Sequence, residues 1–126
     1  MIILDTDCLS LFEREKYLEL STLHANLAHY DSEDIATTII TFEEQMRGWM
    51  SYLAKCKTIE QQIAAYQRLN QFLENFRKIN FLPFDEKAAK IFKDLKSQKI
   101  RIGTMDLKIA SITIANDALL ISRNLK

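Results

Sequence analysis

The chain begins Met1-Ile2-Ile3-Leu4-Asp5-Thr6-Asp7, in which three apolar residues are followed directly by two acids. Such a short apolar run, rich in β-branched side chains, is typical of a strand buried on both faces of a parallel sheet. The polar residues after it have the capping side chains that begin a helix. This stretch therefore predicts an α/β fold, with its acids at the carboxyl end of the first strand.

The rest of the chain alternates short apolar runs with longer helical patterns. Strands are predicted over 35–40, 81–84 and 118–121, and helices over 17–30, 41–53, 58–79, 85–95 and 104–115. Thr41 and Glu44 have the spacing of a capping box, and Pro83 indicates a strand at an edge or an end of the sheet. The longest helix is predicted to face the core with one apolar row: Ile59, Ile63, Tyr66, Leu69, Leu73, Phe76 and Ile79.

The composition is that of one folded domain without a glycine-rich ligand loop. Hydrophobic residues make up 48% and charged residues 27% of the 126 residues, which are ordinary globular values. Gly48 and Gly103, the only glycines, are too far apart to form either glycine-rich phosphate-binding motif. We therefore predict a single domain over 1–126 with three α/β/α layers. Its centre is a short parallel sheet of about four or five strands with helices on both faces.

Charge and rare residues narrow the possible functions. Seventeen basic and seventeen acidic residues cancel, which excludes binding of nucleic acid through a bulk positive charge and leaves metal ions or a local basic patch. Cys8 and Cys56 form no C-x-x-C pair, which favours a reducing cytoplasm over a zinc or disulfide framework. No apolar run is long enough to span a membrane, and the start of the chain lacks the basic region of a signal peptide. His24 and His29 lie at no predicted strand end, which disfavours a Ser or Cys hydrolase.

Acidic residues recur where strands end and helices begin. Asp5 follows the first strand, Glu43 and Glu44 follow the second, and Asp106 begins the helix after Gly103. Ligands of open α/β sheets bind beyond the carboxyl ends of the strands, so these acids are expected in one cleft. Carboxylates crowded together repel one another unless a hard cation such as Mg²⁺ or Mn²⁺ compensates them. The same acids are also common helix N-caps, and position alone leaves both interpretations open.

Four motifs, in order along the chain, resemble a known family. They are Met1-Ile-Ile-Leu-Asp-Thr-Asp7, Thr41-Phe-Glu-Glu-Gln-Met-Arg-Gly48, Gly103-Thr-Met-Asp-Leu-Lys-Ile-Ala110 and Leu120-Ile-Ser-Arg-Asn124. Together they resemble the PIN-domain ribonucleases, especially the VapC-type toxins of toxin–antitoxin modules. The resemblance covers essentially the whole chain and implies a PIN-like fold.

This resemblance implies an endoribonuclease that depends on Mg²⁺ or Mn²⁺, is held inactive by a cognate antitoxin and forms a homodimer; the cysteines place it in the cytoplasm. Its substrate would be RNA, hydrolysed at phosphodiester bonds. The family pattern selects Glu44 over Glu43 as the second acid and assigns metal binding and catalysis to Asp5, Glu44 and Asp106. Asn124 takes the fourth catalytic position. The secondary candidates are Thr6, Asp7, Glu43 and Ser122.

Two other functions remain open from the sequence. Leu4-Asp5-Thr6-Asp7 resembles the Asp-x-Asp motif of haloacid-dehalogenase-like phosphatases, in which the first Asp is the nucleophile. Alternatively, the chain is a PIN-like binding module with weakened catalysis. Asn124 in place of a carboxylate motivates this hypothesis, as does the lack of the Asp-Phe pair and closing strand that usually follow in the family.

Overall fold

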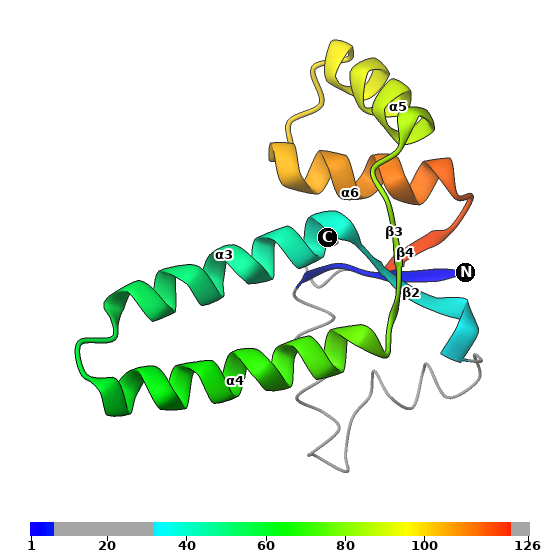
Figure 1. Ribbon diagram of the computed structural model, residues 1–126. Helices are drawn as coiled ribbons and strands as arrows, with labels where there is room; N and C mark the ends of the chain where they lie inside the picture. Colours follow the sequence, from blue (N-terminus) through cyan, green and yellow to red (C-terminus); the bar gives the residue numbers. More distant parts are fainter. Residues whose placement is uncertain (7–31, 122–126) are drawn as a thin grey trace.

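The computed structural model describes residues 1–6 and 32–121, which form a parallel sheet flanked by helices (Figure 1). The elements in order are β1 (Ile2–Leu4), the 3-10 turn η1 (Ser32–Asp34), β2 (Ile35–Thr38), α3 (Ile39–Lys55), α4 (Ile59–Arg77), β3 (Asn80–Leu82), α5 (Glu86–Ser97), α6 (Thr104–Ala115) and β4 (Leu119–Ile121). The helix predicted over 17–30 lies outside the described residues. No helix in the described ranges is long and apolar enough to cross a membrane.

The first strand of the chain lies inside the sheet. The strand order in the described sheet is β3-β2-β1-β4, and all neighbours are parallel. Ile3 of β1 is in register with Ala36 of β2 on one side and with Leu120 of β4 on the other. Its neighbours on both sides explain why β1 is apolar at every position and fully buried. β3 lies at the edge, as Pro83 indicated.

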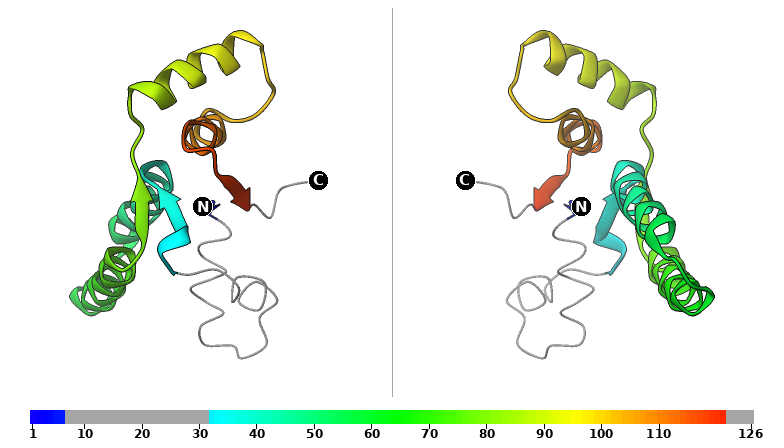
Figure 2. Two further views of the ribbon diagram at one scale, coloured as in Figure 1. Left: turned by 90° about the vertical axis from the view of Figure 1, so that its right-hand side faces the viewer. Right: turned by 90° about the vertical axis from the view of Figure 1, so that its left-hand side faces the viewer.

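Two apolar clusters cover the two faces of the sheet, which confirms the three layers predicted from the sequence. Ile2 and Leu4 pack with Phe72 and Phe76 of α4, and Ile121 joins this cluster. The adjacent Leu120 packs instead with the cluster formed by α5 and α6. Because successive residues of a strand point to opposite faces, the clusters lie on opposite sides of the sheet. Figure 2 shows the α5–α6 pair and the α3–α4 pair on different sides of the strands.

Helix α3 begins earlier than the sequence predicted. The strand expected over 35–40 ends at Thr38, and Ile39 is already helical. Thr38 is the N-cap, and its hydroxyl accepts a hydrogen bond from the Thr41 backbone N–H at 3.1 Å. The capping box predicted for Thr41 and Glu44 is therefore wrong, because Thr38 satisfies the first turn. A capping box does form at the start of α4, where Thr58 and Gln61 bond reciprocally.

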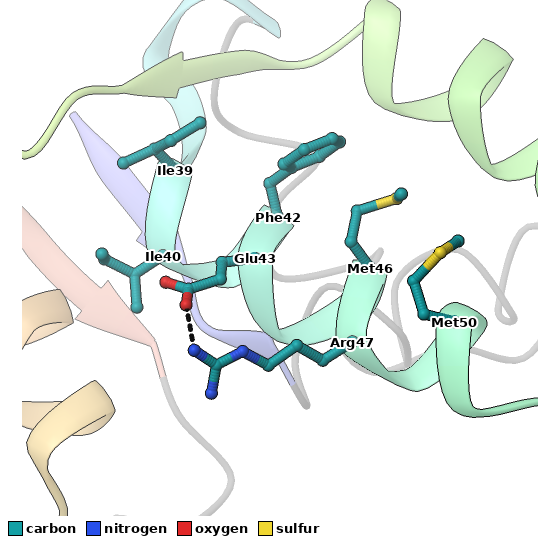
Figure 3. A pocket seen from close by; sticks show the side chains of 7 residues that line it. All are labelled: Ile39, Ile40, Phe42, Glu43, Met46, Arg47 and Met50. Atoms are coloured by element: carbon teal, nitrogen blue, oxygen red, sulfur yellow. Dashed lines mark hydrogen bonds and ion pairs between the residues drawn. The ribbon is translucent and has the colours of Figure 1, made fainter.

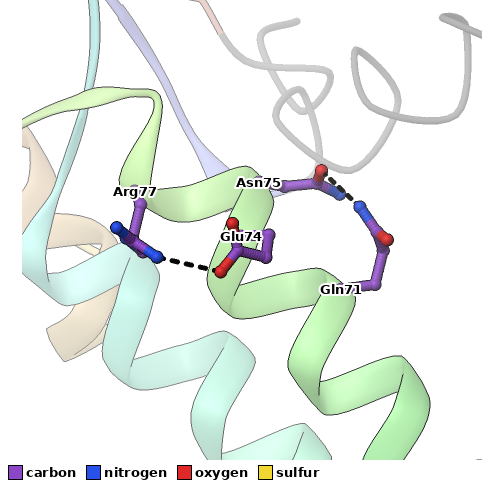
Figure 4. Close-up of polar contacts among 4 residues, drawn as sticks. All are labelled: Gln71, Glu74, Asn75 and Arg77. Carbon is purple, nitrogen blue, oxygen red and sulfur yellow. Dashed lines mark hydrogen bonds and ion pairs between the residues drawn. The ribbon is translucent and has the colours of Figure 1, made fainter.

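Helices α3 and α4 form a hairpin that extends away from the strands (Figure 1). The row of α4 predicted to be buried is only partly so. Ala65, Phe72 and Phe76 are buried, but the side chains of four members of the row are about half exposed or more: Ile59, Ile63, Tyr66 and Leu73. The outer surface of α4 also carries polar contacts between neighbouring turns, Gln71 to Asn75 and Arg77 to Glu74 (Figure 4).

Lys99 and Asp117 directly follow the C-caps of α5 and α6 and have left-handed backbone angles, with φ of 55° and 49°. This conformation costs a residue with a Cβ about 1–2 kcal/mol, and glycine is preferred there. We expect Lys99→Gly and Asp117→Gly each to raise the free energy of unfolding by about 0.5–1 kcal/mol in urea denaturation. The expected gain is smaller than the backbone strain, because glycine has more conformational freedom in the unfolded chain and loses more entropy on folding.

Gln98→Gly is the control, because φ at Gln98 is −80° and glycine relieves no strain there. It should lower stability. If Lys99→Gly also lowered it, the attraction between the lysine and the helix C-terminus would outweigh the backbone strain.

Candidate functional site

Asp5 lies at the carboxyl edge of the sheet, immediately after β1. Its backbone N–H donates to the carbonyl of Ile121 at 3.2 Å, which extends the pairing of β1 with β4 by one residue. Only 8% of the residue is exposed, so Asp5 is buried at the end of an inner strand of the sheet. The position of Asp5 directly after the first strand agrees with the sequence, and its burial is an additional finding.

Thr6 connects this edge to helix α3. Its hydroxyl Oγ1 donates to Oε1 of Glu44 at 2.7 Å, a partly buried contact between residues 38 positions apart. Glu44 reaches this position because α3 starts directly after β2, the neighbour of β1. The structure thus places the second predicted acid beside the residue that follows Asp5.

Three buried threonines fix the geometry behind these side chains. Thr37, Thr38 and Thr41 have no exposed surface. The Thr37 hydroxyl donates to the carbonyl of Leu4 at 2.9 Å, one residue before Asp5, and the hydroxyls of Thr38 and Thr41 lie 3.2 Å apart. These bonds tie the end of β1 to the start of α3. Sequence reasoning read the segment as a β-branched strand and missed this role, although the Thr38-x-x-Thr41 spacing matches an N-cap and its third helical residue.

Glu43 and Glu44 point to different surroundings. Glu43 forms an ion pair with Arg47, one turn further along α3, and both side chains are 40% or more exposed. They lie beside an open, mostly apolar pocket of about 630 Å³ on α3 (Figure 3). The other residues that line it are Ile39, Ile40, Phe42, Met46 and Met50. An exposed ion pair such as Glu43–Arg47 contributes little to stability. Asp5 does not line this pocket, so the pocket is separate from the candidate site.

Asp106 lies in the exposed first turn of α6. The N-cap of α6 is Gly103, which has no side chain to cap the helix, and Asp106 is the third residue of the helix. The positive end of the helix dipole stabilises the negative charge of Asp106. In residues 1–6 and 32–121, no group of three or more Asp, Glu, His or Cys side chains lies close enough to hold a metal ion. Convergence of Asp5, Glu44 and Asp106 on one ion therefore stays a prediction. Asp7, Ser122 and Asn124 lie outside the described residues.

A family model and several solved structures match the chain. Residues 2–126 match the family model described as PIN domain. No curated protein matches the chain. The chain is similar to the crystal structure of VapBC2 from Rickettsia felis, bound to a DNA fragment from their promoter, with TM-score 0.66 and 25% identity, over 100% of this chain and 90% of that one.

Two further solved structures share the fold at lower identity. One is DNA-bound VapBC from Salmonella typhimurium, with TM-score 0.69 and 16% identity, over 99% of this chain and 87% of that one. The other is a toxin–antitoxin complex from Klebsiella pneumoniae, with TM-score 0.64 and 22% identity, over 100% and 88%.

Proposed function

Because the chain belongs to the PIN-domain family, we propose that it is a metal-dependent endoribonuclease and the toxin of a toxin–antitoxin module. The observation that carries this proposal is the arrangement at the carboxyl edge of β1, where the buried Asp5 precedes Thr6 and Thr6 binds Glu44. This contact supports the proposal because it brings Glu44 beside the residue that follows Asp5, at the edge where ligands of α/β sheets bind.

The donors at this edge fit a hard divalent cation. Asp5 and Glu44 offer carboxylate oxygens and Thr6 a hydroxyl, the ligand type that Mg²⁺ and Mn²⁺ prefer. Mg²⁺ needs only one or two protein carboxylates, because water and substrate phosphates complete its coordination. Asp5 and Glu44 would hold the ion, joined by Asp106 and Asn124. When bound, such an ion supplies positive charge to a phosphodiester and lowers the pKa of an attacking water.

The chain's own residues keep these ligands in place. The bond from Asp5 N–H to Ile121 fixes the backbone beneath the first carboxylate, and the Thr37 hydroxyl fixes the residue before it. The Thr6 hydroxyl orients one oxygen of Glu44 and leaves its other oxygen for a ligand. Groups held in this way need no reorganisation when the substrate arrives, which is how enzymes lower the cost of charge that develops during a reaction.

We also propose a cognate antitoxin as protein partner, with the toxin itself a homodimer. The matched Klebsiella pneumoniae structure is a toxin–antitoxin complex, which supports a partner of that kind. The exposed apolar residues of α4 give further support. Ile59, Ile63 and Tyr66 follow one another along the helix, and Tyr66 borders a pocket of about 480 Å³ between α3 and α4. An apolar surface of this kind is typical of a protein interface.

Cleavage of a structured RNA by the purified protein tests the proposal. We expect cleavage with Mn²⁺ or Mg²⁺ and none in EDTA. Glu44→Gln should slow it by about 10- to 100-fold, because an amide is a weaker metal ligand than a carboxylate. Glu74→Gln makes the same substitution at an exposed position of α4 and should cleave like the parent. Equal rates with and without EDTA would refute metal dependence.

The same preparation separates the two other hypotheses. A phosphatase would transfer phosphorus from a phosphoester onto Asp5, which mass spectrometry detects. A binding module would bind the antitoxin but give no calorimetric signal with Mn²⁺. PIN-family membership favours the nuclease over the phosphatase, and the metal titration separates the nuclease from the binding module, which has the same fold.

A further inference from the structure

Positive charge is concentrated in one part of this neutral protein. Residues 85–108 carry seven Lys or Arg and four Asp or Glu, whereas the whole chain has a formal net charge of zero. Two of the four acids, Asp85 and Glu86, lie at the start of α5. The other two acids, Asp94 and Asp106, face six Lys or Arg over residues 90–108, so the charge there is still clearly positive. We name this the α5 basic surface, and it consists of Lys90, Lys93, Lys96, Lys99, Arg101 and Lys108.

The spacing of the lysines spreads their charge over the outside of α5. Lys90, Lys93 and Lys96 are three residues apart. Each lysine therefore lies about 4.5 Å further along the helix axis than the one before it, and is rotated about 60° less than a full turn from it. The opposite side of the helix packs on α6 through residues such as Ala88 and Ile91. All three lysines are exposed, and together they cover the side of the helix that faces away from α6.

Within the part of the chain that the structure describes, no ion pair involves these cations. In residues 1–6 and 32–121, the ion pairs are Glu43–Arg47 and Glu74–Arg77, both on the α3–α4 hairpin. Aromatic rings position part of the charge instead. The ammonium groups of Lys96 and Lys108 lie 5.6 and 6.0 Å from the centre of the Phe92 ring. Such contacts order a lysine without neutralising it.

The α5 basic surface leads directly to the candidate site. Arg101 lies two residues before Gly103, the N-cap of α6. A Cβ placed on Gly103 would lie 3.9 Å from Oδ2 of Asp106. Figure 1 shows the loop after α5 running to the end of α6 where that helix begins. A polyanion lying along α5 would thus reach the third predicted acid through Lys99 and Arg101.

We propose that the α5 basic surface binds the phosphate backbone of the RNA and guides it toward Asp5, Glu44 and Asp106. This inference rests on the proposed function, since it takes RNA as the ligand. Unpaired cations at regular intervals bind phosphates without reading bases, so the surface supplies affinity rather than sequence specificity. It also supplies locally the positive charge that the protein lacks as a whole.

Lys99 gives the sharpest test, because replacing it by glycine should increase stability but decrease RNA binding. Its left-handed φ of 55° favours glycine, yet the residue is a cation. Lys99→Gly should raise the melting temperature and weaken RNA binding. Asp117→Gly is the matched control, because it relieves the same strain after α6 and removes no cation. It should raise the melting temperature and leave RNA binding at least as strong as in the parent.

The main experiment measures binding apart from cleavage. Fluorescence anisotropy with a labelled oligouridylate, in EDTA and at several salt concentrations, gives the slope of log affinity against log salt. The triple variant Lys93→Gln, Lys96→Gln, Lys99→Gln should lower the magnitude of that slope by about 2, since each lost phosphate contact on a single strand accounts for about 0.7. The matched control neutralises three exposed lysines of the α3–α4 side, Lys55, Lys57 and Lys78, and should leave the slope unchanged.

The outcomes separate this inference from the proposed function. An unchanged slope in the α5 triple variant, or an equal loss in both triples, overturns the inference even if the parent protein cleaves RNA. Unchanged RNA binding with a lost affinity for polyglutamate overturns it in favour of an acidic protein partner. A reduced slope in the α5 triple alone supports it, and this holds even if the parent proves unable to cleave and the nuclease proposal fails.

Discussion

Asp5→Asn should slow RNA cleavage by about 100- to 1000-fold or more, the scale seen when one preorganised electrostatic group is removed from an active site. The substitution keeps the size of the side chain and leaves the backbone bond to Ile121 in place. It removes the negative charge of a buried residue that would hold the metal ion. The measurement is the initial cleavage rate of a structured RNA at saturating Mn²⁺, with thermal unfolding of both proteins alongside.

The control for this variant is Asp117→Asn, which removes an exposed carboxylate far along the chain and should cleave at the parent rate. An Asp5→Asn protein that cleaved as fast as the parent would identify the activity as a contaminant. Loss of activity together with a large drop in melting temperature would instead assign Asp5 a structural role.

Phe72→Ala should lower the free energy of unfolding by about 3–5 kcal/mol, as expected for truncation of a buried aromatic ring. Phe72 is 6% exposed, and its ring centre lies 5.9 Å from Phe42, 5.4 Å from Phe76 and 6.1 Å from Trp49. The ring therefore joins α3 to α4 and both helices to β1. Since domains are stable by only about 5–15 kcal/mol, the loss should be obvious in urea denaturation.

Leu73→Ala is the matched control on the next residue of α4. Leu73 is 47% exposed, so its truncation should cost at most about 1 kcal/mol. Similar losses from both variants would mean that the outer side of α4 is buried in solution, as in a dimer. In that case the loss from Leu73→Ala would depend on protein concentration.

The sequence predicted the presence of the helices and strands better than it predicted which side of each helix is buried against the sheet. Helical spacing identified α4 as a helix but left Ala65 and Phe72 out of the predicted row, because spacing alone does not say which side of a helix meets the sheet. Two rows run side by side along this helix. Ala65, Phe72 and Phe76 belong to the buried row, whereas Ile63 and Tyr66 belong to the exposed one. The predicted row mixed members of both, because α4 packs in a hairpin that leaves part of its apolar surface uncovered.

The candidate site was predictable where it depends on topology. Asp5 and Glu44 follow neighbouring parallel strands, and the rule that such strands end at one edge places both residues on that side of the sheet. Their convergence on one ion stays a prediction. The rule gives no side-chain contacts. The bond between Thr6 and Glu44 and the bond from Thr37 to Leu4 depend on where α3 begins, and Ile39 and Ile40 hid that point by resembling strand residues.

The pairing of β1 with β4 also has a kinetic consequence. It joins residues 2–4 to residues 119–121, so nearly the whole chain must be gathered before the two strands meet. Contacts so distant in sequence form slowly, because the entropy of closing the intervening chain is lost before the contacts repay it. The backbone of Asp5 is therefore set late in folding. Hydrogen exchange during refolding should show the Asp5 amide, bonded to Ile121, among the last to become protected.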